Sequence, residues 1–361
     1  MKNSFGNSLT VTIFGESHGE EIGAVIDGIA PGVKVEDDFI KKALTLRRPH
    51  GRISTARQEE DKFRIVSGVF EGYTTGTPIT ILIPNENTKS KDYKAIADIP
   101  RPSHADYAAE EKYHGYQDYR GGGHFSGRIT AALVAAGAIV NSALQNKGIF
   151  IGTHINSLHG IKDKSINSLE DAKLLGDKLF PVLSEEAEEK MKAEILLAAE
   201  SGDSVGGVLE TSVYGVPAGV GEPFFDSMES VLSHMLFSVP AVKGVEFGEG
   251  FGFADLYGSE ANDPFIIEDG KVKTKTNKSG GINGGITNGM PITFRCAVKP
   301  TPSIYKEQDS VSLSLMKETK LKIEGRHDPA IIHRVRAVVD AAAAIAIADM
   351  LTVRFGTDYL R

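Results

Sequence analysis

The chain has 361 residues, 41% of them hydrophobic, and carries 40 Lys and Arg against 48 Asp and Glu, a formal net charge of −8. A chain of this length buries roughly 75% of its unfolded surface, which suits a large core. The single cysteine, Cys296, excludes an intramolecular disulfide and a cysteine-based metal cage. The acidic balance argues against a nucleic-acid partner, and the first apolar stretch, about six residues, is too short for a signal peptide or membrane span. We therefore expect a cytoplasmic protein.

Strand and helix signals follow each other in mixed order along the chain. Alternating or β-branched runs predict strands at residues 9–14, 22–27, 63–70, 78–83, 208–214 and 292–298. Helix signals occur at residues 36–46, 105–113, 185–200 and 225–237. Because the strands come in neighbouring pairs, antiparallel sheets are expected.

Two further helices, at residues 127–144 and 329–351, are apolar on nearly every face, which is typical of helices buried all round. They predict an α+β fold, a sandwich of antiparallel sheets around a buried helical core, in a single domain of residues 1–361. A faint similarity between residues 25–32 and 212–219 suggests an internal duplication with a boundary near residues 150–205.

Positive charge is concentrated locally in this acidic chain. Residues 47–64 hold six cations and three anions, an excess of +3. This segment indicates a site for a small, multiply charged anion.

The first candidate motif is Gly15-Glu16-Ser17-His18-Gly19, which follows a predicted strand. A loop of this kind presents His18 as a proton donor near neutral pH, or it is a polar turn that only satisfies backbone groups. It formally matches the Gly-x-Ser-x-Gly nucleophile elbow. That motif requires a helix after the turn, whereas a strand is predicted here, which argues against a serine hydrolase.

Two neighbouring segments, residues 101–107 and 119–128, carry Arg101, His104, His124 and Ser126. Ser126 begins a buried helix, where free amides favour an anion, although an ordinary N-cap needs no ligand. The ten-residue spacing of His104, His114 and His124 matches no metal motif, and no metal site is expected.

Near the C-terminus, Asp328 precedes Pro329, a favoured pair at a helix start, so the residue is either a helix cap or a catalytic carboxylate. The segment Lys299-Pro300-Thr301-Pro302-Ser303 ends a strand and is either a phosphate site or a Pro-rich turn. Neither a P-loop nor a Gly-x-Gly-x-x-Gly motif opening a helix occurs.

In this order, the motifs closely resemble those of the chorismate synthase family, and the resemblance runs along nearly the whole chain. It is carried by residues 15–19, 101–107, 126–128, 299–303 and 326–329, with further matches at residues 27–32, 47–49, 67–72, 215–221 and 241–246. The resemblance implies a carbon–oxygen lyase of the shikimate pathway, which eliminates phosphate from 5-enolpyruvylshikimate 3-phosphate to give chorismate. It also implies reduced FMN as cofactor and a homotetramer. Without a dinucleotide motif, an external flavin reductant is expected, with NAD(P)H only an indirect reductant.

The family's functional residues map onto this chain residue by residue. His18 would protonate or stabilise reduced flavin, His104 would assist the departing phosphate, and Asp328 would work with flavin N5 in removing the ring proton. Flavin contacts would fall at Arg47, His124, Phe125, Ser126, Pro240, Ala241, Gly284, Lys299, Pro300, Thr301, Pro302, Ser303 and Arg326. Substrate anions would meet Arg47, Arg48, Arg101, Ser126 and Arg128, because arginine pairs with carboxylates and phosphates through two parallel hydrogen bonds.

The chain departs from the family pattern in two places. The sequence His124-Phe125-Ser126-Gly127-Arg128 stands where the family has Arg-Ser-Ser-Ala-Arg, and Asp340 replaces an expected glutamate. Two rival interpretations remain from the residues alone: a non-catalytic protein that binds a phosphometabolite or flavin, and a polyanion-binding module. Chorismate formation with reduced FMN separates all three.

Overall fold

The computed structural model describes residues 2–54, 60–86, 98–323 and 327–361. Two five-stranded sheets dominate it, and the paired strands of both are antiparallel, which confirms the predicted α+β class with antiparallel sheets. The first sheet has the order β1-β2-β3-β7-β4, with β1 (Ser4–Phe5), β2 (Thr10–Gly15), β3 (Glu21–Asp27), β4 (Arg64–Ser67) and β7 (Ile79–Pro84). The second has the order β11-β16-β10-β8-β9, with β8 (Phe150–Leu158), β9 (Ile161–Lys162), β10 (Gly207–Tyr214), β11 (Val242–Phe247) and β16 (Ile292–Val298).

The helices differ in how much of their surface is buried. They are α1 (Asp37–Arg47), α2 (Asp106–Tyr113), α3 (Thr130–Asn146), α4 (Leu169–Leu175), α5 (Glu185–Glu200), α6 (Met228–Leu236), α7 (Gly258–Ala261) and α8 (Ile332–Phe355). Most residues of α3 and α8 are buried, as the apolar sequence predicts. Short 3-10 turns complete the set: η2 (Arg120–Phe125), η3 (Gly127–Ile129), η4 (Phe224–Asp226), η5 (Gly250–Asp255) and η6 (Thr357–Leu360).

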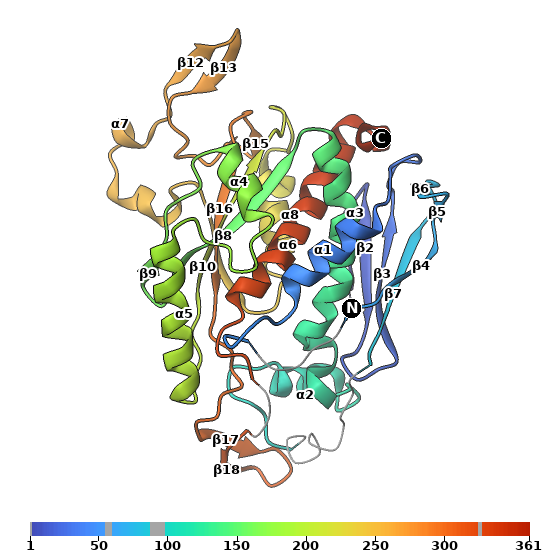
Figure 1. Ribbon diagram of the computed structural model, residues 1–361, viewed down its shortest axis with the longest axis vertical. Helices are drawn as coiled ribbons and strands as arrows, with labels where there is room; N and C mark the ends of the chain where they lie inside the picture. The colour runs from blue at the N-terminus through green and yellow to red at the C-terminus, as the bar shows by residue number, and fades with distance from the viewer. Residues whose placement is uncertain (1, 55–59, 87–97, 324–326) are drawn as a thin grey trace.

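Helices α3 and α8 connect the two sheets. Helix α3 packs on β3 and β7 of the first sheet, α8 packs on β8 and β10 of the second, and the two helices contact each other (Figure 1). Their contact is close at Gly137, where an added Cβ would lie 2.4 Å from the Cβ of Ala341. One apolar cluster runs through these layers and includes residues from Leu9 to Leu360.

Four two-stranded hairpins surround this core: β5 (Val69–Phe70) with β6 (Tyr73–Thr74), β12 (Phe265–Glu268) with β13 (Lys271–Thr274), β14 (Ile282–Asn283) with β15 (Ile286–Thr287), and β17 (Gln308–Ser312) with β18 (Lys317–Leu321). In Figure 1, β17–β18 and α2 lie at the lower end of the molecule, whereas β12–β13 project from the upper end.

A buried carboxylate joins the last helix to the start of the chain. Asp349 of α8, fully buried, accepts hydrogen bonds from the backbone N–H groups of Asn7, Ser8 and Leu9 at 2.7–3.0 Å. These contacts fix the turn between β1 and β2 on the helical layer.

One helix among the described residues, Gly127–Asn146, is long and apolar enough to span a membrane by length and composition. Because 89% of its apolar window is buried inside the protein, it is accounted for as a core helix.

Candidate active site

The loop after β2 places His18 against three consecutive glycines, Gly121–Gly123, which we call the glycine run. Gly121 has φ of +60°, and an added Cβ there would lie 2.2 Å from Cε1 of His18, so only glycine leaves room for the ring. The backbone N–H of Ser17 donates to the carbonyl of Gly123 at 3.1 Å, and Nδ1 of His124 bonds the carbonyl of Gly15 at 2.8 Å. The two segments therefore form one unit around the buried His18 ring.

His104, in the turn just before α2, reaches the same glycine run. An added Cβ on Gly122 would lie 3.5 Å from Nε2 of His104. On the other side of the ring, Nδ1 is 2.6 Å from Oδ1 of Asp106, so the N–H at this position donates to the carboxylate and Nε2 remains for other chemistry. The rings of His18 and His104 thus pack against neighbouring glycines, His18 against Gly121 and His104 against Gly122.

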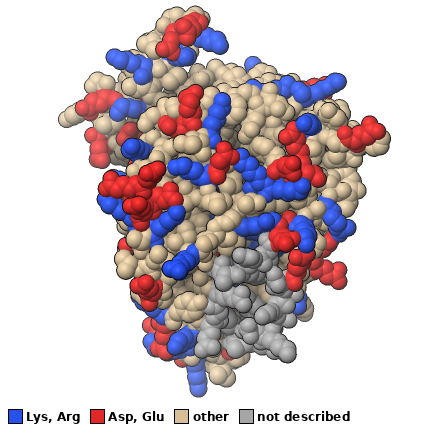
Figure 2. Space-filling view, in the orientation of Figure 1, with Lys and Arg blue, Asp and Glu red and all other residues tan. Residues whose placement is uncertain are grey.

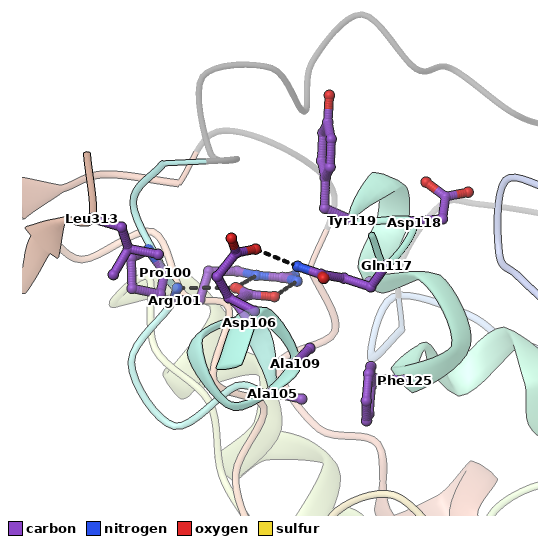
Figure 3. Close-up of a pocket in the computed structure, with 12 residues that line it drawn as sticks. Pro100, Arg101, Ala105, Asp106, Ala109, Gln117, Asp118, Tyr119, Phe125 and Leu313 are labelled. Carbon is purple, nitrogen blue, oxygen red and sulfur yellow. Dashed lines mark hydrogen bonds and ion pairs between the residues drawn. The ribbon is translucent and has the colours of Figure 1, made fainter. Parts of the chain in front are cut away.

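Arg101 is paired within the protein rather than facing solvent. Its guanidinium makes two hydrogen bonds to Asp106, from Nε at 2.7 Å and from Nη2 at 2.8 Å (Figure 3). Burial opposes ionisation of Asp106, but hydrogen bonds from Arg101 and His104 hold the pKa of this carboxyl well below its usual range. The carboxylate therefore orients two of the predicted site residues at once.

A cavity of about 30 Å³ lies between α2 and the glycine run and is lined by Phe125 and Tyr119 (Figure 3). This volume admits only a few water molecules, so the cavity marks the seam between the two segments and is not itself a substrate pocket.

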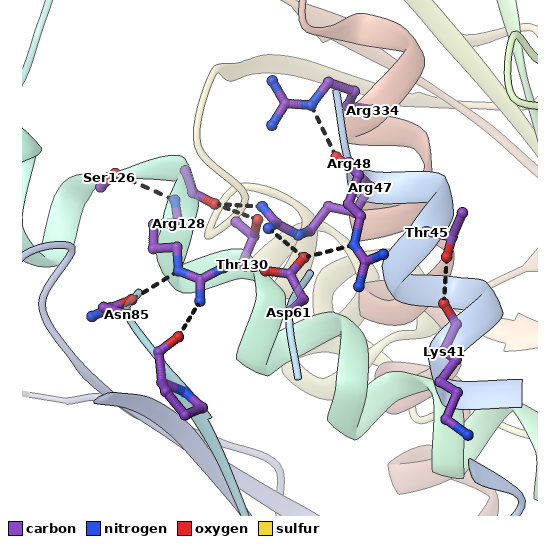
Figure 4. A network of polar contacts seen from close by, with 12 residues as sticks. Lys41, Thr45, Arg47, Arg48, Asp61, Asn85, Ser126, Arg128, Thr130 and Arg334 are labelled. Atoms are coloured by element: carbon purple, nitrogen blue, oxygen red, sulfur yellow. Dashed lines mark hydrogen bonds and ion pairs between the residues drawn. The ribbon is translucent and has the colours of Figure 1, made fainter. Parts of the chain in front are cut away.

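A second group of charged residues surrounds Asp61, whose side chain is fully buried. Arg47 of α1 donates to it at 2.9 Å, Arg128 of η3 is in direct contact with it, and Nε of Arg48 lies 3.6 Å away (Figure 4). Burial raises the pKa of Asp61, but the charges of Arg47 and Arg128 more than compensate and hold it below the ordinary value.

Arg334 and Asp328 extend this group. Nη1 of Arg334 is 2.5 Å from Asp328, and its Nε donates to the backbone carbonyl of Arg47 at 2.9 Å. We call Arg47, Arg48, Arg128, Arg334, Asp61 and Asp328 the arginine cluster. Four guanidinium groups face two carboxylates in it, which leaves an excess of two positive charges for an anionic ligand.

Asn85, directly after β7, joins the arginine cluster to the histidine loop. Its amide donates to the carbonyls of Glu16 and Gly19, both at 2.9 Å, while its carbonyl oxygen accepts from Nε of Arg128 at 2.8 Å. The two groups of predicted site residues therefore belong to one connected site.

The segment after β16 lies at the same site. Arg101 Nη1 is 3.5 Å from the hydroxyl of Ser303, Lys299 contacts the backbone carbonyl of Ser103, and its own N–H donates to the carbonyl of Ala241 at 3.0 Å. Burial, together with Lys243 nearby, lowers the pKa of Lys299. This arrangement adds a cation and hydroxyl groups to the site.

Two buried polar atoms in this region have no hydrogen-bond partner among the described residues: Oγ1 of Thr301 and Nε2 of His327. Burial and the adjacent Arg101 lower the pKa of His327, so its ring is neutral near pH 7. Unpaired buried polar atoms beside a lysine and a serine hydroxyl fit a phosphate-bearing cofactor such as FMN.

Several predicted residues have other roles or positions. Ser126 caps η3 by accepting a hydrogen bond from the backbone N–H of Arg128 at 3.3 Å, which is the ordinary N-cap that the sequence offered as one of two interpretations. Asp328 is not a helix cap, because α8 begins at Ile332 rather than at residue 329. Asp340, which stands where a glutamate was expected, pairs with Arg336 at 3.1 Å.

The predicted flavin contacts do not all come together in one chain. Ala241 adjoins Lys299, and Pro240 is exposed beside it. Gly284, in contrast, lies between β14 and β15, near the Ile292 end of β16, whereas Lys299 follows the other end of that strand. Arg326 lies outside the described residues. Within the described ranges, no group of three or more His, Cys, Asp or Glu is placed to hold a metal ion.

Sequence reasoning missed four residues that organise the site: Asp61, Asp106, Asn85 and Arg334. Asp106 had a local signal, since it follows His104 by two residues. Asp61, Asn85 and Arg334 have partners in distant segments, with Arg47 14 positions from Asp61, Arg128 43 from Asn85 and Arg47 287 from Arg334. Their roles therefore depend on the fold.

Comparisons with known proteins agree with this geometry. Residues 9–352 match the family model described as chorismate synthase. The chain is 49% identical over 349 residues to the chorismate synthase of Pyrococcus abyssi and 46% identical to that of Thermococcus gammatolerans, with 97% of each chain covered. The chain belongs to the chorismate synthase family. A crystal structure of chorismate synthase has a TM-score of 0.76 to it at 29% identity, covering 97% of this chain and 94% of that one.

The predicted resemblance to the chorismate synthase family is thus confirmed. Membership implies an enzyme that acts on a small molecule, and the motifs that carried the resemblance all fall within residues 9–352.

Proposed function

We propose that this chain eliminates phosphate from 5-enolpyruvylshikimate 3-phosphate in a 1,4-sense to give chorismate, as a carbon–oxygen lyase of the shikimate pathway. One observation carries the proposal: His18 and His104 lie at consecutive glycines and are joined through Asn85 to the arginine cluster. The substrate has two carboxylates and a phosphate, which the excess guanidinium charge of the cluster suits.

In the proposed reaction a ring C–H bond and the C–O bond to phosphate break, and a new double bond forms in the ring. The hydrogen bond from Nδ1 of His104 to Asp106 fixes the orientation of the ring. Nε2–H then donates to an oxygen of the departing phosphate. Arg101, held by the same carboxylate, supplies a fixed positive charge beside the leaving group.

Asp328 is the proposed acceptor of the ring proton. It does not cap α8, and Arg334 holds its carboxylate within the arginine cluster. This placement suits a base that acts on a substrate bound by Arg47 and Arg128. His18, enclosed at Gly121, holds a proton on its ring toward the flavin.

The residues that would hold reduced FMN are Lys299, Thr301, Ser303 and Ala241, together with His124–Ser126, Arg47 and the prolines Pro240, Pro300 and Pro302. The unpartnered Oγ1 of Thr301 and Nε2 of His327 support this assignment. When bound, reduced FMN supplies the electron density that assists phosphate loss. Phe125, 37% exposed, offers an aromatic face where the family carries a small residue.

The remaining partners are proposals as well. A homotetramer would let a neighbouring copy bring Gly284 to the site, since Gly284 and Lys299 lie at opposite ends of β16. We further propose a cytoplasmic enzyme that receives reduced flavin from an external reductant, with NAD(P)H acting only indirectly. Acidic and basic side chains are mixed across the face shown in Figure 2, which does not favour a nucleic-acid partner.

Anaerobic incubation of the purified chain with substrate and photoreduced FMN tests the proposal. Chorismate and phosphate should form in equal amounts, and only when reduced flavin is present. A protein that merely binds flavin or phosphometabolites would yield neither, even though both ligands bind.

The Asp328→Asn variant tests the proposed base. An asparagine amide does not accept a proton near neutral pH, so turnover should fall at least about 10²-fold while FMN still binds. The matched control is Asp309→Asn, which removes a carboxylate from an exposed ion pair with Lys320. Parental turnover in Asp328→Asn would assign the proton transfer to another group.

A further inference from the structure

A second cavity lies on another side of α8, between α1, α3, α4 and β8. Its volume is about 180 Å³, and small residues on three helices make the room: Ala43 on α1, Gly137 and Ala138 on α3, and Ala337 and Ala341 on α8. Cavities of about 150 Å³ hold a benzene ring in proteins, so this one accommodates an aromatic ring.

The cavity wall is apolar over much of its area. Phe39, Leu46, Val134, Phe150 and Ile151 contribute to it. A wholly apolar cavity would suit a hydrocarbon, but polar groups at one side give this one a definite chemistry.

Arg336 is the deepest of these polar groups, with an exposed fraction of 1%. Its Nη1 donates to Asp340 at 3.1 Å, and its Nη2 donates to the backbone carbonyls of Leu175 and Lys178 at 3.0 and 2.7 Å. Nε of Arg336 is buried and has no hydrogen-bond partner in the part of the chain that the structure describes, and the same holds for Oδ1 of Asn141. The wall therefore presents an unused donor and an unused acceptor, both withdrawn from solvent.

The charge around the cavity favours an anion. Lys173 lies over the ring of Phe150, with Nζ 4.4 Å from the centroid, and Lys42 is engaged with Asp177 outside the wall. Against these cations and Arg336, Asp340 is the one acid among the described residues that line the wall. Burial raises the pKa of Asp340, while Arg336 and a hydrogen bond from Thr153 oppose that rise. The balance is positive on a protein whose net charge is −8.

We propose that this cavity binds a small aromatic carboxylic acid. The ring occupies the space between the alanines of α1, α3 and α8, and the carboxylate accepts from Nε of Arg336 and from Lys173. A hydroxyl group on the ring donates to Oδ1 of Asn141. This site is separate from the arginine cluster and does not depend on the reaction proposed there.

Benzoate and 3-hydroxybenzoate are the probes, with benzyl alcohol and acetate as controls that lack the charge and the ring. Titration calorimetry should give a dissociation constant of about 0.1–1 mM for the aromatic acids, with 3-hydroxybenzoate the tighter, and no measurable binding of the controls. In NMR, ligand protons should show nuclear Overhauser effects to the methyl groups of Val134 and Ile151. Saturating inorganic phosphate, which competes at the arginine cluster, should leave this binding unchanged.

Filling the cavity provides the matched variants. Ala43→Met places a longer side chain into the cavity and should weaken benzoate binding at least tenfold. Lys41→Met adds the same side chain to the same helix at a position that is 63% exposed, and should bind as the parent does. The proposal is overturned if Ala43→Met binds like the parent, if benzyl alcohol binds as tightly as benzoate, or if phosphate displaces the acid. Should Ala43→Met fail to fold, the methyl contacts in the parent still decide, because their absence refutes the site.

Discussion

Replacement of Asp61 by asparagine perturbs the arginine cluster with almost no change in shape. The fully buried carboxylate accepts from Arg47 at 2.9 Å and contacts Arg128, with Arg48 3.6 Å away. An amide keeps one acceptor oxygen but turns an NH₂ group toward cations. Asp61→Asn therefore leaves guanidinium groups buried without their counter-charge.

The expected cost follows from that loss. Removing one partner of a buried ion pair typically costs about 3–5 kcal/mol, because the other charge stays desolvated. At roughly 2.1 cal/mol/K per residue, a chain of 361 residues unfolds with an entropy of about 0.8 kcal/mol/K. The melting temperature should therefore fall by about 4–6 °C.

Differential scanning calorimetry with and without inorganic phosphate measures the effect. Phosphate should stabilise Asp61→Asn more than the parent, because the arginine cluster of the variant has one carboxylate fewer. Asp309→Asn is the control: its carboxylate is 86% exposed, and the shift should stay within about 1 °C. If Asp61→Asn melts with the parent, or gains no more from phosphate than the parent does, Asp61 does not hold the arginine cluster together.

Three further predictions concern a glycine contact, a helix contact and a buried histidine. Gly121→Ala forces a Cβ to within 2.2 Å of the His18 ring, so turnover should fall by at least about 10²-fold. Parental turnover in a steady-state assay would show that the position of this ring is unimportant. Gly137→Ala brings a Cβ to 2.4 Å from that of Ala341, and urea unfolding should show a loss of about 1–3 kcal/mol, whereas an unchanged midpoint would mean that α3 and α8 separate freely. Burial lowers the pKa of His154, but its hydrogen bonds to Glu210 on β10 and Asp163 after β9 outweigh burial. The pKa of His154 is therefore raised above 6.5. The stabilisation of the fold by protonated His154 is therefore complete below pH 6.5 and is lost as pH rises through the folded-state pKa. The difference in unfolding free energy between the parent and His154→Gln should shrink from pH 6 to pH 9. A constant difference would refute the role of the charge.

The elements predicted best from sequence were those with strong local signals. Strand β16 spans Ile292–Val298 and helix α5 spans Glu185–Glu200, both as predicted, because the first alternates in burial and the second begins with a serine cap and acids. Strand β8 was missed although it pairs with β10 in the second sheet. Its Thr153 and His154 are polar yet fully buried, and their hydrogen-bond partners lie elsewhere in the chain. Thr153 bonds Thr211, and His154 bonds Asp163 and Glu210.

At the site, the sequence supplied candidate side chains but not the contacts that hold them, and the roles of those side chains stay predictions. His18 and His104 were identified from their loops, and the structure brings both to the glycine run. Of the two interpretations of Asp328, the helix cap is wrong, because three residues separate it from the start of α8 and its carboxylate pairs with Arg334 instead. Its catalytic role stays a prediction. The anchoring of the arginines by acids and the position of Gly284 depend on contacts between distant segments. The internal duplication stays a prediction.

A crystal structure of this chain with oxidised FMN and 5-enolpyruvylshikimate 3-phosphate tests the central claim most directly. We predict the substrate carboxylates and phosphate on the guanidinium groups of the arginine cluster and Arg101, with Nε2 of His104 within about 3.2 Å of the oxygen that links the phosphate to the ring. The flavin should lie between the glycine run and the Lys299–Ser303 segment, with a ring carbon of the substrate next to Asp328. Ligands bound elsewhere, or a phosphate remote from both histidines, would contradict the account.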